Sequence, residues 1–272
     1  MTYKLDFELS PQLEIYREQI EASIKPYLEL KITDNGNPTL WQTKFGGYPY
    51  LPKNCEYPKS WDGKYLYLLA QINFGELPHL DDFPEQGILQ FYIGDEGLYG
   101  CDFDNPRQQN NFRILYFPEV DLEEDNLITD FSFLPDKANL PIDGCSTVEW
   151  IERYAPMNIA DYSYYTFSKD EMEMAEEISF FLEEQEEKGS ELFADDGHKL
   201  GGYPFFVQDD PRLLKLSRKG KEQYNLLLQI DTDENDTISI MWGDSGIGNF
   251  FIKRSMLKKL DFSDVIYNWD CA

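Results

Sequence analysis

The residues of this chain that could bind a ligand or take part in catalysis are carboxylates, amides and aromatic side chains close to turns. Asp231 and Asp233 begin an oxygen-rich cluster that runs to Asp236, directly after an apolar run. Oxygen atoms at alternating positions suit a hard cation such as calcium. The EF-hand pattern is not met, because its glycine is absent and Trp242 stands at its last ligand position. We expect a solvated hairpin turn here and keep a cation-binding turn as the alternative.

A second candidate is the string Gly-Asp-Ser-Gly, which also surrounds the nucleophile of some serine proteases. It contains Asp244 and Ser245, and the related string Gly-Asp-Glu-Gly contains Asp95. The aspartate repeats but the serine does not, and aspartate favours turns by bonding its own backbone. A nucleophilic serine also needs a base, and the chain has two histidines. The pattern therefore predicts two turns rather than a protease site.

His198 follows two aspartates and a glycine, so a carboxylate could orient it as a general base. Nothing nucleophilic is paired with it, and we expect a histidine on a surface loop. We predict no catalytic residue, no metal site and no cofactor. The four cysteines are widely spaced, which indicates reduced thiols rather than a zinc site; they are Cys55, Cys101, Cys145 and Cys271.

The elements around these residues recur. Three blocks occur in the same order in both halves of the chain, which indicates one duplication rather than a solenoid. The matching pairs are 44–50 with 199–205, 68–72 with 226–230, and 94–97 with 243–246.

Each block has a readable structure. Gly-Gly-Tyr-Pro predicts a sharp turn that leads into an extended segment. The run 65–72 is apolar on both faces, as in a central strand. Alternating apolar residues precede the third block at 89–93 and at 238–242, with nine extra residues assigned to 74–86. These patterns predict antiparallel strands in both halves.

Two helices complete the expected architecture. One begins at Ser10-Pro11 and ends near Pro26, and the other begins at Ser168, with Phe167 in a hydrophobic staple, and ends at Gly189. The fold class is α+β and mostly β, with internally duplicated antiparallel sheets that form a roll or pseudo-barrel flanked by helices. The expected halves are 1–140 and 165–272 of a single unit, joined by a connector at 141–164.

Two glutamines, Gln71 and Gln229, end the apolar strands at matching places. They either tie neighbouring strands and turns together or contact a ligand, and we favour the first. If the chain binds a small molecule or a cation, we expect the site where the halves meet. Its candidate residues are Tyr48, Gln71, Asp95, Tyr203, Gln229, Asp231, Asp233, Trp242 and Asp244.

The charge of the chain is strongly acidic. The 272 residues include 51 Asp+Glu against 24 Lys+Arg, a formal net charge of -27. Such a surface repels phosphate backbones, so we expect no nucleic-acid partner. Acidic residues crowd 119–136 and 161–196, and a basic patch is expected around Arg212. We expect a non-catalytic binding protein that captures a basic protein partner. Mimicry of nucleic-acid charge by the acidic helix is a third hypothesis.

No apolar run approaches the roughly 20 residues that span a bilayer, so we expect no membrane partner. Asp6 and Glu8 interrupt the region where a signal peptide would be apolar, which favours a cytoplasmic protein. The oligomeric state has no signature in the sequence.

The chain resembles the YwqG family of bacterial cytosolic proteins. The resemblance rests on Gly-Gly-Tyr-Pro at 201–204, the strand 226–231, and Met-Trp-Gly-Asp-Ser-Gly at 241–246 followed by Gly-Asn-Phe-Phe-Ile at 248–252. It covers essentially the whole chain. The resemblance implies a duplicated β-rich fold, with the two halves curling into a roll or pseudo-barrel flanked by helices. Because the family has no established activity, the resemblance carries no catalytic residue over to this chain. Some relatives look like members of toxin–immunity neighbourhoods, which implies an immunity-like role.

Overall fold

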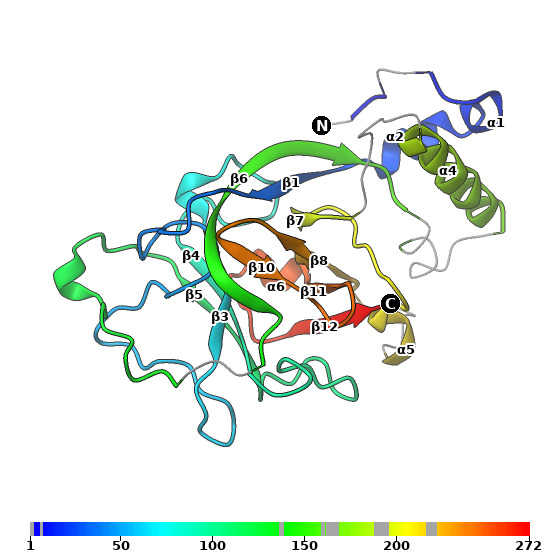
Figure 1. The fold of residues 1–272 in the computed structure, drawn as a ribbon. Coiled ribbons are helices and arrows are strands. Elements are labelled where there is room, and N and C mark those ends of the chain that lie inside the picture. Colours follow the sequence, from blue (N-terminus) through cyan, green and yellow to red (C-terminus); the bar gives the residue numbers. More distant parts are fainter. Residues whose placement is uncertain are drawn as a thin grey trace.

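A computed structural model describes residues 3–5, 8–135, 139–158, 161, 169–187, 196–215 and 222–272. Most of its regular structure is β (Figure 1). The strands are β1 (Lys25–Ile32), β2 (Lys44–Gly46), β3 (Tyr67–Asn73), β4 (Ile88–Ile93), β5 (Phe112–Phe117), β6 (Ile142–Ala155), β7 (His198–Gly201), β8 (Tyr224–Asp231), β9 (Asp233–Glu234), β10 (Ile238–Ile240), β11 (Gly246–Lys253) and β12 (Val265–Cys271). The helices are α1 (Pro11–Glu14), α2 (Arg17–Ser23), α4 (Lys169–Glu187), α5 (Pro211–Lys215) and α6 (Arg254–Leu257), with short 3-10 turns η1 (Phe74–Glu76) and η2 (Glu124–Asn126).

The sheet shows the duplication in its strand order. The order is β12-β11-β8-β7-β1-β6-β2-β3-β4-β5, and every pairing is antiparallel. It reads the same from either end when β1 is matched with β6, β2 with β7, β3 with β8, β4 with β11, and β5 with β12. The first strand of each half pairs with the second strand of the other half, so the halves are interlocked. The segment 141–164, expected as a connector, contributes the long strand β6.

Register and irregularity repeat as well. Lys44 pairs with Gln71, and Lys199 pairs with Gln229. A bulge leaves Leu69 out of the β3–β4 ladder, and a bulge leaves Leu227 out of the β8–β11 ladder. A bulge bends a strand and increases its twist. Bulges at matching positions give both halves the same curvature, so the predicted duplication and fold class are confirmed.

The third predicted repeat is wrong. The counterpart of β4 is β11, because these strands pair with β3 and β8 respectively. The segment 238–242 instead contains β10, which pairs with β6 and β9. Gly-Asp-Glu-Gly follows its strand, whereas Gly-Asp-Ser-Gly precedes its strand. The true match is Gly-Ile-Leu-Gln-Phe-Tyr-Ile at 87–93 with Gly-Ile-Gly-Asn-Phe-Phe-Ile at 246–252. The halves therefore differ far less in loop length here than the expected nine residues.

The Gly-Gly turns have the predicted form in both halves. Gly46 and Gly47 have φ of 66° and 70°, and Gly201 and Gly202 have φ of 76° and 75°. Only glycine adopts two consecutive left-handed conformations at little steric cost. The turns end β2 and β7 at the same point and direct the chain over the outer face of the sheet.

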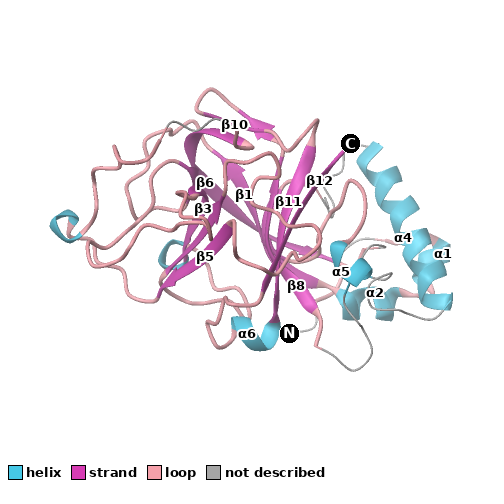
Figure 2. Ribbon diagram, turned by 90° about the horizontal axis from the view of Figure 1, so that it is seen from below, coloured by secondary structure: helices cyan, strands magenta, loops and turns pink. Residues whose placement is uncertain are grey.

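The sheet curls until its two ends face each other, which makes a nearly closed barrel (Figure 2). Phe91 of β4 lies 4.8 Å from Phe250 of β11, and Phe112 of β5 lies 5.3 Å from Tyr267 of β12, as distances between ring centroids. The gap between β5 and β12 is bridged by the loop after β4, whose Pro106 carbonyl accepts the Tyr267 N–H. Aromatic side chains from both halves thus fill one shared core.

Three helices, α1, α2 and α4, lie together beside the barrel, whereas α6 lies apart from them in contact with β11 (Figure 2). Leu13 and Ile20 pack against Met174 and Ile178 of α4, which buries the apolar faces of α1, α2 and α4. Ser10 caps α1 as predicted by accepting the Leu13 N–H, but the expected single helix is divided into α1 and α2. The predicted cap and end of the second helix, at 167–168 and 189, lie outside the described residues. No helix in the described ranges combines the length and apolarity that crossing a bilayer requires.

Candidate functional site

The two predicted glutamines are buried and bind backbone. Gln71 Oε1 accepts the Tyr50 N–H at 2.8 Å, and its Nε2 donates to two carbonyls in the segment before β2. Gln229 Oε1 accepts the Phe205 N–H at 2.8 Å, and its Nε2 donates to the Gly197 carbonyl at 2.9 Å. Each amide thus ties the segments on both sides of a Gly-Gly turn to the central strand. Of the two roles predicted for these glutamines, this arrangement is the first, in which they tie neighbouring strands and turns together.

The three predicted aromatic residues lie in different surroundings. Tyr48 is 57% exposed and stacks on Phe131 at 4.7 Å. Tyr203 is buried, and its hydroxyl donates to the Ser23 carbonyl. Trp242 is buried in the shared core above Gly248, where any side chain would clash with the indole. The structure does not bring these rings together around one space.

His198 is buried rather than on a surface loop, so that expectation is wrong. The strand β7 begins at His198, and the ring packs edge-on against Phe45 at 4.9 Å. Its Nδ1 accepts the Asp231 N–H at 2.9 Å. Its Nε2 lies 3.3 Å from Asp233 Oδ2, an ion-pair distance. This neighbour holds the pKa of Asp233 below its usual value, whereas burial raises the pKa of Asp231.

The oxygen-rich cluster is tied up in local bonds. Asp231 accepts the Gly197 and Thr232 N–H groups at 2.7 Å each. Asn235 accepts the Thr237 N–H and donates to the Thr33 carbonyl. Such contacts are typical of a hairpin turn, which is the structure that we expected for this cluster. Within the described ranges, no group of three or more histidine, cysteine or acidic residues is arranged to hold a metal ion.

Asp95 and Asp244 lie in separate turns. Asp95 borders a small cavity of about 60 Å³ after β4. Asp244 is exposed in the turn before β11, next to Ser245, which has a φ of 130°. The two aspartates do not occupy equivalent places, because one turn follows its strand and the other precedes it.

The expected basic patch is wrong at Arg212, which is fully buried. Its guanidinium donates to Asp210 at 2.7 Å and to Asp161 at 3.2 Å, and lies 4.8 Å from the centre of the Phe251 ring. Burial raises the pKa of Asp161 despite the guanidinium. The ionic group of Arg212, Asp210 and Asp161 covers the outer face of the second half beside the strand Tyr224–Asp231.

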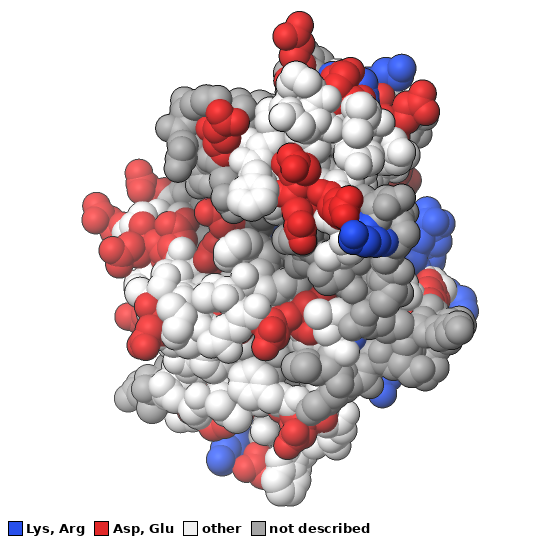
Figure 3. Space-filling view, turned by 90° about the vertical axis from the view of Figure 1, so that its right-hand side faces the viewer, with Lys and Arg blue, Asp and Glu red and all other residues white. Residues whose placement is uncertain are grey.

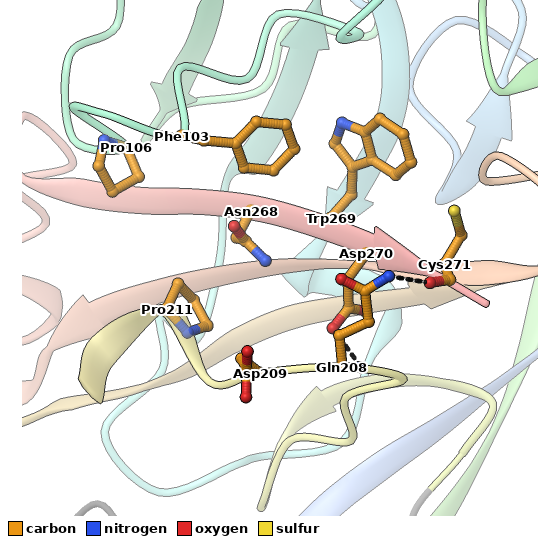
Figure 4. A pocket seen from close by; sticks show the side chains of 9 residues that line it. All are labelled: Phe103, Pro106, Gln208, Asp209, Pro211, Asn268, Trp269, Asp270 and Cys271. Carbon is orange, nitrogen blue, oxygen red and sulfur yellow. Dashed lines mark hydrogen bonds between the residues drawn. The ribbon is translucent and has the colours of Figure 1, made fainter. Parts of the chain in front are cut away.

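The candidate site is a cavity of about 320 Å³ beside β12, called here the β12 cavity (Figure 4). The loop after β4, the segment before α5 and the edge strand itself contribute to its wall. Its lining includes Phe103, Pro106, Asp209, Asn268, Trp269 and Asp270. Ligand cavities are commonly mostly apolar with a few polar groups that set orientation. The β12 cavity combines these features in one place.

Asp270 is the buried charge of this cavity. Its carboxylate accepts the Gln208 N–H at 2.9 Å and the Val207 N–H at 3.3 Å. Burial raises the pKa of Asp270, and these two N–H groups oppose the shift. Each carboxylate oxygen keeps a further lone pair, because an ionised carboxylate accepts about four hydrogen bonds. Asp270 can therefore receive donors from a ligand.

Asn268 lies two residues earlier on the same face of β12. It is 7% exposed, and its amide points toward Pro211 and Asp209 (Figure 4). Among the described residues, its side chain has no hydrogen-bond partner. Its amide atoms are not among the fully buried atoms that lack a partner in the described residues, so they are open to the cavity, where water can bond them.

Two rings, Phe103 and Trp269, lie on the other face of β12 from Asn268 and Asp270 (Figure 4). Phe103 and Trp269 lie 5.9 Å apart in a tilted arrangement. The Trp269 Nε1 donates to the Leu98 carbonyl at 2.9 Å, which holds the indole against the loop after β4. The indole of Trp269 thus packs on the core of the barrel, 6.2 Å from the Trp242 ring.

Sequence reasoning missed this cavity. The available signal was the alternation of Asn268 and Asp270 with Tyr267 and Trp269 in a strand, which places two polar side chains on one face. The segment around Asp209 that meets this face is about 60 residues away in the chain, so its proximity was not visible.

Comparisons with known proteins give a family and no function. The model of a family described as Domain of unknown function (DUF1963) matches residues 43–271, which covers both halves of the barrel. A search of the curated proteins finds no match to the chain.

Proposed function

Because the chain belongs to the DUF1963 family, whose function is unknown, we propose its function from its own surface: it is a non-catalytic protein that captures a basic protein partner. The observation that carries this proposal is the exposed stretch 119–130, called here the acidic segment. Its acidic side chains are all exposed, and no ion pair among the described residues involves them. They are Glu119, Asp121, Glu123, Glu124, Asp125 and Asp130.

The acidic segment is held in place by the barrel. The Asp121 N–H donates to the Tyr50 hydroxyl at 2.9 Å, and the Ile128 N–H donates to the Leu51 carbonyl at 2.8 Å. Leu127 is buried in the core of the first half. Preorganised charge lowers the ordering cost of binding, so the segment favours an interface over a merely soluble tail.

The segment also presents an apolar contact. Leu122 is 57% exposed between the carboxylates. A partner with basic residues around an apolar groove would match this pattern. Complementary charge raises association rates by about 10 to 1,000-fold at low salt, and screening reduces the gain beyond roughly 10 Å at 0.1 M salt. Capture is therefore expected to depend on ionic strength.

A matched pair of variants tests this proposal. One variant changes Glu119, Glu123, Glu124 and Asp125 to their amides, which leaves the bonded Asp121 intact. The control removes the same charge from exposed positions of α4, at Glu173, Glu176, Glu177 and Glu184. Figure 3 shows that acidic side chains also lie on the side of the molecule that carries the helices. Because the control variant removes charge from that side, it tests whether net charge alone explains the retention.

The immobilised protein is expected to retain basic proteins from a lysate at low salt, and retention is expected to fall for the first variant only. Failure to retain any basic protein at low and moderate salt would contradict the proposal. Equal loss in both variants would reduce it to a general effect of net charge.

A second function, binding of a small molecule or a cation, is favoured by the β12 cavity. None of the nine candidate residues expected from the sequence lines that cavity. Membership of the YwqG family and a cytoplasmic location also stay proposals. The family proposal rests on the Gly-Gly-Tyr-Pro turns.

A further inference from the structure

The strand β5 ends the sheet, and part of its outer edge is unpaired. The Ile114 N–H donates to the Gln109 side chain at 2.9 Å rather than to β4. Because bonding alternates along an antiparallel strand, Ile114 and Tyr116 both turn their backbone groups away from the sheet. Within the described ranges, the Ile114 carbonyl and both backbone groups of Tyr116 have no hydrogen-bond partner. They form a short row of free donors and acceptors.

A groove of about 470 Å³ runs along this edge, and we call it the β5 groove. Residues 113–116 line it consecutively. Successive residues of a strand point to opposite faces, so the groove follows the backbone edge of β5 rather than either face of the sheet. The opposite wall is the loop after α6, which contributes Leu260, Phe262 and Ser263. The free backbone groups of β5 therefore face a walled space.

The Gln109 amide shows how wide the β5 groove is at one end. Its Oε1 accepts the Ile114 N–H, and its Nε2 donates to the Phe262 carbonyl of the opposite wall at 2.7 Å. The C=O and N–H groups of an inserted strand would point to the two walls in the same way. The groove is thus as wide as one extended chain. The β5 edge of a second copy would bring its own β4 into the wall, so a single strand fits better.

The corresponding edge of the second half is covered. By the register of the two halves, Tyr267 of β12 is the counterpart of Ile114. The Tyr267 N–H donates to the Pro106 carbonyl at 2.9 Å, and the Tyr267 carbonyl accepts from the Cys101 thiol at 3.5 Å. Proteins normally cover or blunt such edges, because a free edge pairs with other chains. In the part of the chain that the structure describes, β5 has no equal cover.

We propose that the β5 groove binds an extended segment of a partner protein, which adds to β5 as a further strand. The free groups of Ile114 and Tyr116 bond its backbone, and Leu115, Leu260 and Phe262 contact apolar side chains at alternate positions of the segment. In strand addition, backbone hydrogen bonds give affinity and the alternate side chains give specificity. This inference rests on the groove alone and does not depend on the acidic segment.

The first test is amide hydrogen exchange of the full chain, followed by NMR. In the free chain the Tyr116 amide is expected to exchange fast, whereas the amides of Leu115 and Phe117, which bond β4, exchange slowly. The probe is the capped peptide Thr-Val-Thr-Val-Thr. If its dissociation constant is about 1 mM, then about 10 mM peptide slows exchange at Tyr116 by about tenfold. The same peptide N-methylated at every residue lacks the backbone donors and is expected to leave exchange unchanged.

A matched pair of variants tests the location. Ser263→Trp fills the β5 groove from the opposite wall, and Ser132→Trp is the control, because Ser132 does not line the groove. Both serines are exposed and end similar turns, in which their N–H groups donate to Asp261 and Asp130 respectively. Ser263→Trp is expected to keep the melting temperature and weaken peptide binding at least about tenfold. The control is expected to bind as the natural chain does.

The proposal is overturned if the Tyr116 amide of the free chain is as protected as that of Leu115, or if the unmethylated peptide does not slow its exchange. Equal action of the N-methylated peptide, or normal binding by a folded Ser263→Trp variant, would also overturn it. A dimer in sedimentation, with Tyr116 protection that grows with the concentration of the chain alone, would assign the edge to a second copy instead. These outcomes leave the retention of basic proteins by the acidic segment unchanged, so the two proposals fail separately.

Discussion

The two halves of the molecule share a skeleton but differ in what covers it. Strand order, register, Gly-Gly turns and bulges match between the halves. The outer face of the first half is covered by an aromatic cluster, in which Tyr57 packs on Tyr92 at 5.9 Å. In the second half Arg212 lies over Phe251, the counterpart of Tyr92. A duplicated fold thus keeps its backbone bonds and varies the cover.

Inside the barrel the differences compensate for each other. The Asn73 N–H donates to Thr43 Oγ1 at 2.9 Å, and the Asp231 N–H donates to His198 Nδ1 at 2.9 Å. Different side chains serve the same backbone group at matching positions. On the outer face of β12 no such exchange occurs, because Asn268 and Asp270 stand where the first half has Leu115 and Phe117. Uncompensated differences of this kind are the better guide to function.

The largest expected effect is a difference in stability between the residues that cover the outer faces of the two halves. Arg212→Leu leaves the carboxylates of Asp161 and Asp210 buried without their cation. We expect a loss of about 3–5 kcal/mol in the free energy of unfolding, since an uncompensated buried charge is that costly. Tyr57→Leu in the first half removes only apolar contact and is expected to cost about half as much. Urea unfolding of both variants measures the difference, and equal losses would show that the covers are energetically alike.

The strand pattern and the turns could be predicted from the sequence because local rules control them. Two glycines before Tyr-Pro have few alternatives to a tight turn, and the run around Leu69 and Leu227 is apolar enough to require a central strand. The third repeat was misassigned because Gly-Asp-x-Gly is a stronger string match than β4 with β11. In that true pair Gln90 is replaced by Asn249, and strand pairing decides the match.

Burial and distant contacts limited the prediction of the site. His198 follows acidic residues and a glycine, which is the local signature of a loop, yet pairing with β1 starts a strand there. Arg212 reads as part of a basic surface until Asp161 and Asp210 are placed around it. The β12 cavity needs three segments far apart in the chain. Local patterns do not encode such meetings, so only the fold reveals them.

The next prediction concerns the bulge, a feature that both halves share, and compares its contribution to stability in each half. Leu69 and Leu227 are the bulged residues of matching strands, and both are fully buried. We expect Leu69→Ala and Leu227→Ala each to cost about 2–5 kcal/mol, with values that agree within about 1 kcal/mol. Denaturant unfolding provides both numbers. A large disagreement would mean that the shared backbone hides different packing.

A smaller effect distinguishes the two turns. Gly46→Ala and Gly201→Ala both place alanine in the left-handed region, which costs about 1–2 kcal/mol. A Cβ at Gly46 would also clash with the Gly144 carbonyl oxygen, whereas a Cβ at Gly201 meets Leu80 Cδ2 at 3.2 Å. We therefore expect Gly46→Ala to cost at least about 1 kcal/mol more. Thermal unfolding of the two variants tests this order, and a reversed order would contradict the close approach of the first turn to β6.

The smallest effect concerns the pair that only the second half has, His198 with Asp233. The folded pKa of Asp233 lies below its unfolded value of about 3.9, so the pair stabilises the fold above that pH. The contribution disappears as the pH falls through the lowered folded pKa, because the carboxylate is then protonated in both states. Asp233 is half exposed, so we expect Asp233→Asn to cost less than about 1 kcal/mol at pH near 5 and nothing well below pH 3. Urea unfolding at both pH values measures it. A cost that persists in acid would assign the effect to the turn around Asp233 instead of to its charge.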